Sequence, residues 1–416
     1  MAFEGSQITR SVTRVSGFRD PEFDYRLLRT MGVADYGGST VGECLAAAAM
    51  VTDGDPESWV EAFSGLARRV QDRAEACAAA GHLVSARDHF LRASTYNRAA
   101  EYYAEADPQR MTALGQAGRR CFERGAQLTD PPVEALEIPF ERGALPGYLV
   151  RPGRRPGDAT PIGTLVALGG FDSGAEELYF QLGVPGAARG WQVVVFDGPG
   201  QLGAMIRDPG WVFRPDYEVP VGAVLDAIGA RTDVPADRVA LAGLGFGGYF
   251  AARAAAFDRR VRALVLDSPI VDLYRYLEAL VGPAPFAMRQ DIRPEDVAGI
   301  PEDLLPQQML WGIFAVCRRF GVASLQAWKA HLDAYRLGPA VGAIACPVLG
   351  LVGEREGPEV LAQAEQLVAG VRGPATLFRF GVDDGADAHC QADNLRFAAQ
   401  VVYDWLDERF ADRSES

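Results

Sequence analysis

The spacing of hydrophobic residues divides the chain into two parts with different predicted secondary structure. Between about residues 21 and 129, apolar residues recur every three or four positions, as in "ESWVEAFSGLARRVQDRAEACAAA", which predicts amphipathic helices. The tripeptide Asp55-Pro56-Glu57 is typical of a helix start, because an acidic cap precedes a proline in the first turn. No period of about 20 to 50 residues repeats along this part, which argues against a helical solenoid. We therefore expect an N-terminal helical domain over residues 1–132.

From residue 133 onward, short apolar segments alternate with helical ones. The segments "ALEIPF" and "LPGYLVRP" predict two paired strands, and six later segments predict buried strands: "GTLVALGG", "WQVVVFDGPG", "RVALAG", "VRALVLDSP", "CPVLGLVGE" and "ATLFRF". This alternation predicts an α/β fold with a mainly parallel sheet covered by helices on both faces. Residues 270–337 have helical spacing, are rich in Leu, Phe, Trp and Tyr, and predict a helical insertion or lid. The expected architecture is an α/β core over residues 133–416 with an N-terminal helical cap.

Composition narrows the classes of function. Of the 416 residues 48% are hydrophobic and 23% are charged, which is typical of a soluble protein with a large core. The net charge of -14 argues against nucleic acid or an anionic membrane as a partner, so we expect a small-molecule substrate, with a homodimer left open. The six cysteines lack a C-x-x-C motif and the four histidines lack H-E-x-x-H spacing, so neither a disulfide framework, a metal site nor a cofactor is expected. Residues 1–12 lack the pattern of a signal peptide, which predicts a cytoplasmic protein.

The segment "VALAGLGFGGYF", Val239 to Phe250, fits two motifs with different chemistry. Its glycines fit G-x-G-x-x-G, a dinucleotide-binding loop, and Asp267 lies 19 residues beyond Gly248, where a ribose-binding carboxylate is expected. They also fit G-x-S-x-G, the nucleophile elbow of an α/β-hydrolase, with Gly245 in place of the serine. The motif follows at least two earlier strands of the sheet, whereas a dinucleotide loop occupies the first βα turn. We therefore favour the elbow.

The remaining parts of a hydrolase site occur in the order that this fold requires. Glu356 follows the strand "PVLGLVG" as the candidate acid, although Glu354 and Asp383 compete for this role, and His389 lies in the last loop as the candidate general base. The expected oxyanion donors are the backbone N–H groups that follow the "GG" and "LG" turns, those of Phe171 and Phe246. Cys390 could replace the nucleophile, but adjacent side chains usually point apart, which favours a buried thiol without a catalytic role.

Longer motifs over most of the chain resemble one group of capped α/β-hydrolases. In the helical part these are "YGGSTVGECL", "DGDPESW" and "GHLVSARDHFLRAS"; in the core they are "GGFDSGAEELYF", "FDGPGQ", "FRPDYE", "GLGFGGYFAARAAAFDRRVRALVLDSP" and "GADAHCQADN". The group includes 2,6-dihydroxypseudooxynicotine hydrolase, fungal polyketide-shortening hydrolases of pigment pathways and FrsA-like proteins. The resemblance implies cleavage of C–C, ester or related acyl bonds by Ser, an acid and His, and a partly apolar polyketide or aromatic ketone as substrate. It also implies substrate contacts by Arg92, Tyr96 and His82 of the cap. Asp172 and Ser173, after the oxyanion loop, could bind substrate or cap a turn.

Gly245 is the departure from this group, and it leaves four interpretations open. Glycine tolerates the positive φ of the elbow, so the turn should form without a nucleophile. His389, oriented by Glu356, could activate a water molecule, or it could remove a substrate proton and drive elimination, cyclisation or C–C cleavage. The protein could instead bind a ligand without turnover, or carry an engineered Ser-to-Gly change. We expect non-serine catalysis by His389, Glu356 and an oxyanion hole.

Overall fold

The computed structural model of the chain describes residues 17–153, 161–297, 300 and 307–411. Residues 1–12, where no signal peptide was expected, lie outside this part. Within the described residues, every helix is too short or too polar to cross a membrane. The same residues contain no group of three or more His, Cys, Asp or Glu side chains that could hold a metal ion.

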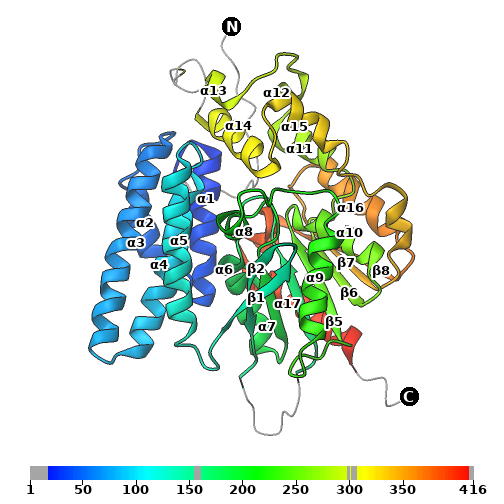
Figure 1. The fold of residues 1–416 in the computed structure, drawn as a ribbon, viewed down its shortest axis with the longest axis horizontal. Coiled ribbons are helices and arrows are strands. Elements are labelled where there is room, and N and C mark those ends of the chain that lie inside the picture. The colour runs from blue at the N-terminus through cyan, green and yellow to red at the C-terminus, as the bar shows by residue number, and fades with distance from the viewer. Residues whose placement is uncertain (1–16, 154–160, 298–299, 301–306, 412–416) are drawn as a thin grey trace.

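The N-terminal part is helical, as the spacing predicts, and forms a bundle beside the sheet (Figure 1). The cap of α3 confirms the predicted helix start, because the Asp55 side chain accepts a hydrogen bond from the Glu57 N–H at 3.0 Å, next to Pro56. Aspartate-proline pairs also begin α1 and α5. The elements are α1 (Pro21–Gly32), η1 (Val33–Tyr36), α2 (Val41–Ala48), α3 (Pro56–Ala79), α4 (Leu83–Tyr102) and α5 (Pro108–Ala126).

The second part is built on one sheet of eight strands, in the order β1-β2-β4-β3-β5-β6-β7-β8. The strands β1 and β2 form an antiparallel hairpin that adds to β4, and the other six strands are parallel. All eight coincide with the predicted segments. They are β1 (Glu134–Phe140), β2 (Gly143–Val150), β3 (Thr164–Leu168), β4 (Gln192–Phe196), β5 (Val239–Leu244), β6 (Val261–Asp267), β7 (Val348–Gly353) and β8 (Ala375–Phe380).

Helices cover both faces of the sheet, which explains why its inner strands β3, β4 and β5 are buried at every position, whereas burial alternates along the edge strand β1. In β3, Val166 and Leu168 pack into a core that includes α9 and α10, whereas Leu165 and Ala167 pack into a second core that includes α17. The α/β architecture is therefore confirmed. The helices of this part are α6 (Ala175–Leu178), η2 (Tyr179–Gly183), α7 (Val184–Ala188), α8 (Leu202–Arg207), α9 (Glu218–Gly229), α10 (Gly247–Phe257), α16 (Pro358–Gly370) and α17 (Leu395–Phe410).

Helices also occur in the described parts of the segment between β6 and β7. In Figure 1 they lie above one end of the sheet, opposite the end at which the C-terminus emerges. These insertion helices are α11 (Leu273–Val281), α12 (Ala284–Ala287), α13 (Pro294–Val297), α14 (Gln307–Phe320) and α15 (Leu325–Leu332). The carboxyl ends of the parallel strands, where α/β proteins bind ligands, face these helices.

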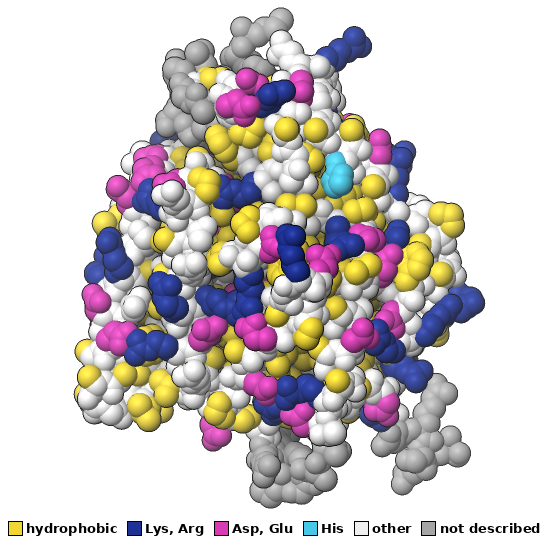
Figure 2. All heavy atoms as spheres, viewed as in Figure 1, with side chains coloured by type: hydrophobic (Ala, Val, Ile, Leu, Met, Phe, Trp, Pro, Cys, Tyr) yellow, Lys and Arg dark blue, Asp and Glu magenta, His cyan; other side chains and the backbone are white. Residues whose placement is uncertain are grey.

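Charged side chains of both signs are interspersed on the face shown in Figure 2, with apolar atoms between them. In the described structure, charged side chains also pair across elements, such as Arg253 with Glu218 at 2.8 Å and Arg142 with Asp208 at 2.7 Å. The net charge of -14 is therefore not concentrated into one acidic patch on this face.

Candidate active site

The turn between β5 and α10 has the geometry of an elbow at Gly245. This residue has a φ of +58°, and its N–H donates a hydrogen bond to the Asp267 carbonyl at the end of β6. A side chain in this conformation is strained, whereas glycine adopts it freely. A Cβ atom added to Gly245 would lie 3.4 Å from Nε2 of His389. The glycine therefore occupies the place from which a serine hydroxyl would face this imidazole.

His389 is held by Glu356, as the order of motifs predicted. His389 Nδ1 lies 2.9 Å from Glu356 Oε2, and the two side chains are 14% and 3% exposed. The Glu356 carboxylate also accepts hydrogen bonds from the Gly353 N–H at 2.8 Å and from the Ser268 hydroxyl at 3.0 Å. A carboxylate fixed in this way orients the ring and stabilises its protonated form. The competing acids do not reach the ring: Glu354 and Asp383 are exposed.

Cys390 differs from the expectation that its side chain would point away from His389. Its Sγ lies 3.5 Å from His389 Nε2 and 3.5 Å from the Asp267 carbonyl oxygen. The reason is a backbone φ of +53° at Cys390, which turns the side chain back toward the imidazole. Burial raises the pKa of this thiol well above its usual value, and the nearby Asp267 and Glu356 carboxyl groups raise it further. The thiol is therefore neutral, and its S–H is a weak donor to the nitrogen or the carbonyl.

The two residues expected to supply the oxyanion donors lie in separate turns and both line the cavity. Phe171 follows β3 and Phe246 follows β5, and in the part of the chain that is described neither N–H donates to a backbone acceptor. The turns are in close contact, since a Cβ added to Gly170 would lie 2.9 Å from the Phe246 nitrogen. The two aromatic rings pack edge to face at 5.4 Å. The predicted oxyanion donors are thus adjacent, with their side chains packed against each other.

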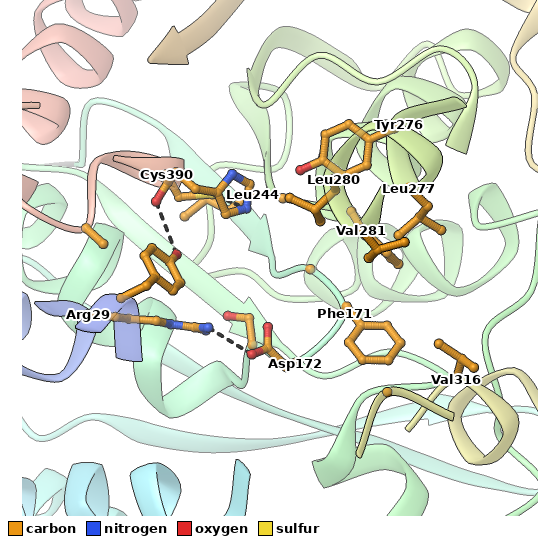
Figure 3. A pocket seen from close by; sticks show the side chains of 18 of the residues that line it. Arg29, Phe171, Asp172, Leu244, Tyr276, Leu277, Leu280, Val281, Val316 and Cys390 are labelled. Atoms are coloured by element: carbon orange, nitrogen blue, oxygen red, sulfur yellow. Dashed lines mark hydrogen bonds and ion pairs between the residues drawn. The ribbon is translucent and has the colours of Figure 1, made fainter. Parts of the chain in front are cut away.

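A cavity lies in front of these groups (Figure 3). Its wall on the side of the insertion helices is apolar, and Figure 3 shows Leu277, Leu280 and Val281 there. Trp311, Val316, Phe320 and Trp328 extend this wall. The opposite wall is polar and consists of Tyr25, Arg29, Asp172, Ser173 and Gln181. The cavity therefore suits a molecule of moderate size with one apolar and one polar end.

Asp172 and Ser173 line the cavity, but their polar atoms already have protein partners. Asp172 forms ion pairs with Arg26 and, at 2.9 Å, with Arg29 of α1, as Figure 3 shows for the latter. The Ser173 hydroxyl donates to Glu177 at 3.1 Å.

Sequence reasoning missed Tyr25 and Arg29. Two arginines three residues apart, on either side of two leucines in the "DYRLLRTM" segment, are the signal that could have identified this helix face.

The three cap residues expected to contact substrate do not line this cavity in the described structure. Arg92 and Tyr96 both bind Glu43 of α2, at 3.1 and 2.7 Å, and His82 is exposed at the start of α4. The periodicity of α4 identifies its faces but not which face meets the core. A different face approaches the core, with Arg98 4.0 Å from Glu177.

Asp267, the candidate ribose ligand of the alternative motif, is a buried residue of the sheet. Its side chain is not part of the cavity wall, and the residue is 5% exposed. Burial raises the pKa of its carboxyl well above the usual value, and the negative charge of Glu356 adds to this. Its position does not support the dinucleotide-binding interpretation.

The neutral state of Asp267 predicts a pH dependence of stability. The folded protein holds a proton that the unfolded chain releases above about pH 4, so the free energy of unfolding falls as pH rises. Asp267→Asn removes this dependence. We expect its melting temperature to exceed that of the native protein by about 2 °C or more at about pH 8, with the difference vanishing near about pH 4. Thermal unfolding followed by circular dichroism measures this, and an equal difference at both pH values would contradict it.

Comparisons with known proteins find named hydrolases among the relatives of this chain. No protein-family model matches the chain. The chain is 32% identical to hydrolase ORFZ of Pyricularia oryzae, covering 94% of this chain and 97% of the relative. It is 32% identical to alpha/beta hydrolase psoB of Aspergillus fumigatus, over 96% of this chain and 95% of the relative. It is 37% identical to 20-hydroxy-prefusarin hydrolase FUS2 of Gibberella moniliformis, over 62% of each chain. Among solved structures, 2,6-dihydroxy-pseudo-oxynicotine hydrolase shares the fold, with a TM-score of 0.69 at 23% identity over 91% of this chain and 95% of that one.

Proposed function

Because the chain belongs to the α/β-hydrolase family, we propose that it is an enzyme that transforms a mid-sized, partly apolar small molecule without a serine nucleophile. The observation that carries this proposal is the His389–Glu356 pair, which keeps the arrangement of a catalytic dyad beside Gly245. The site retains a base, a group that stabilises the protonated base, and two adjacent N–H donors. Only the hydroxyl is missing, and two kinds of reaction do not need it.

In the first kind, His389 acts as general base on a water molecule. Nε2 removes a proton from the water, the oxygen attacks the substrate carbonyl, and the N–H groups of Phe171 and Phe246 stabilise the oxyanion. The imidazolium, stabilised by Glu356, then gives its proton to the leaving group. The space left by a serine side chain at residue 245 is where we place this water.

In the second kind, Nε2 removes a proton from a carbon next to a carbonyl, and the two N–H groups stabilise the enolate. Loss of a β-substituent gives elimination, and attack on a second carbonyl gives cyclisation. In a retro-Claisen cleavage, Nε2 instead takes a proton from water as the water oxygen adds to one ketone of a 1,3-diketone. The C–C bond then breaks to give a carboxylic acid and an enolate, which takes the proton back from His389. The apolar wall of the cavity and its polar end favour a polyketide-like or aromatic ketone or ester. The relative named for 20-hydroxy-prefusarin agrees with a small organic substrate.

The test offers the purified protein a panel of aryl esters, 1,3-diketones and β-hydroxy ketones, with products followed by mass spectrometry. We expect turnover of at least one class that survives treatment with a fluorophosphonate, because no serine carries the reaction. Hydrolysis in ¹⁸O-labelled water gives a labelled acid, whereas elimination gives an unlabelled alkene. Turnover of none of these compounds, together with tight binding of one of them, would favour a ligand-binding protein instead.

The hydroxyl of Ser268 provides a graded test of the dyad. It is fully buried and donates to Glu356 Oε2 at 3.0 Å, so it helps to hold the carboxylate that orients His389. Ser268→Ala should lower kcat about threefold to tenfold, the worth of one such hydrogen bond, and leave KM unchanged. Steady-state kinetics on the best substrate of the panel measures this. A loss confined to KM would show that Ser268 does not act through Glu356.

A further inference from the structure

One buried side-chain amide holds the loop that carries a proposed oxyanion donor. Gln201 precedes α8, in the "DGPGQ" segment after β4, and is 0% exposed. Its Nε2 donates to the carbonyl oxygens of Gly169 and Gly170, at 2.9 and 3.2 Å. Its Oε1 accepts a hydrogen bond from the Gly198 N–H at 2.7 Å. Both ends of the amide are therefore occupied, and the Gln201 side chain connects the loop after β4 to the loop after β3.

The contact with Gly170 bears on the oxyanion hole because of peptide geometry. The Gly170 carbonyl and the Phe171 N–H belong to the same planar peptide unit, in which a trans bond directs the two groups oppositely. A donor on the carbonyl therefore fixes the direction of the N–H. It also polarises the unit, which makes the N–H a stronger donor.

We propose that Gln201 is a positioning residue that sets the direction and donor strength of the Phe171 N–H. This rests on the proposed function only in taking that N–H as an oxyanion donor. The role is distinct from that of Arg319 in α14, whose Nη1 donates to the Phe171 carbonyl at 3.1 Å. That carbonyl belongs to the next peptide unit, so Arg319 holds the loop without acting on the Phe171 N–H directly.

The experiment measures anion binding rather than turnover, with 4-nitrophenolate as probe and 4-nitroanisole as its neutral counterpart. In the native protein the phenolate oxygen should occupy the oxyanion hole, so the phenolate binds more tightly than the anisole. Gln201→Met removes the amide donor. We expect its phenolate affinity to fall about threefold to thirtyfold, less than the loss of a whole oxyanion donor, with anisole affinity changed less than about twofold.

A second buried glutamine provides the matched control. Gln192 lies at the start of β4, whereas Gln201 follows the end of that strand. The Gln192 residue is 3% exposed, and its Nε2 donates to the Asp233 carbonyl at 3.0 Å. Gln192→Met should leave both affinities unchanged. If Gln201→Met does not fold, Gln201→Leu serves instead, because it also lacks a donor to Gly170 and fills the same buried space.

The outcomes separate this proposal from the proposed function. Selective loss of phenolate binding in the Gln201 variant supports the positioning role even if no substrate is turned over. Unchanged phenolate binding, or an equal loss for phenolate and anisole, would overturn it. A native protein that binds both probes equally well lacks an oxyanion hole, which would overturn this proposal and the oxyanion part of the proposed function together.

Discussion

Gly245→Ser is expected to become covalently labelled by a fluorophosphonate that leaves the native protein unmodified. A Cβ at residue 245 would lie 3.4 Å from His389 Nε2, so a hydroxyl one bond further can reach hydrogen-bond distance of the base. The variant would then contain Ser, Glu and His in the chain order of an α/β-hydrolase triad. Intact-protein mass spectrometry should show one adduct, and 4-nitrophenyl butyrate should give a burst of about one equivalent of 4-nitrophenol.

Gly245→Ala is the control for the added carbon. Both variants place a Cβ at a φ of +58°, which costs about 1–2 kcal/mol of stability, so both should melt at a similarly lower temperature. Only the serine variant should be labelled. Equal labelling of the two, or none in either, would show that the dyad is not aligned with this turn.

His389→Gln is expected to lower turnover about 10²- to 10⁴-fold, the usual contribution of a general base. Glutamine can still hydrogen-bond to Glu356 but cannot take up a proton at neutral pH, so the fold should be preserved while proton transfer fails. The measurement is kcat on any compound that the native protein transforms, with thermal unfolding to verify the fold. The result separates an enzyme from a ligand-binding protein, for which binding should be the same in both forms.

The same substitution in the Gly245→Ser background provides an internal control. Labelling by the fluorophosphonate should disappear in the double variant, since the serine then lacks its base. A double variant that is labelled as fast as Gly245→Ser would show that another group activates the hydroxyl.

The strands and the core of the site could be predicted from local signals. Most of the strands are short apolar runs, and their length and the turn residues beside them, rather than periodicity, distinguish them from buried helices. The positions of the site residues are fixed in this fold. The elbow follows β5, Glu356 follows β7, and His389 lies in the last loop. The order of motifs along the chain was therefore enough to pair Glu356 with His389, 33 positions later, whose Oε2 and Nδ1 atoms lie 2.9 Å apart.

The remaining errors concern the direction in which side chains and helix faces point, which the sequence pattern does not contain. The sequence shows that α4 is amphipathic but not that Arg92 and Tyr96 would meet α2 rather than the core. It also gives no sign of the left-handed backbone at Cys390, because this conformation is uncommon for residues other than glycine. Arg29 was missed for a related reason: a buried arginine depends on carboxylates distant in sequence, here Asp172 and Glu177.

The cavity wall combines residues from both ends of the described chain, which determines when the cavity can form during synthesis. Tyr25 and Ala392 both belong to it, so it draws on residues from nearly the whole described length of the chain. During synthesis the ribosome must release the last loop before the first helix can meet it, and the nascent protein stays inactive until then. A protease cut that removes either end should therefore abolish activity even where the central sheet persists.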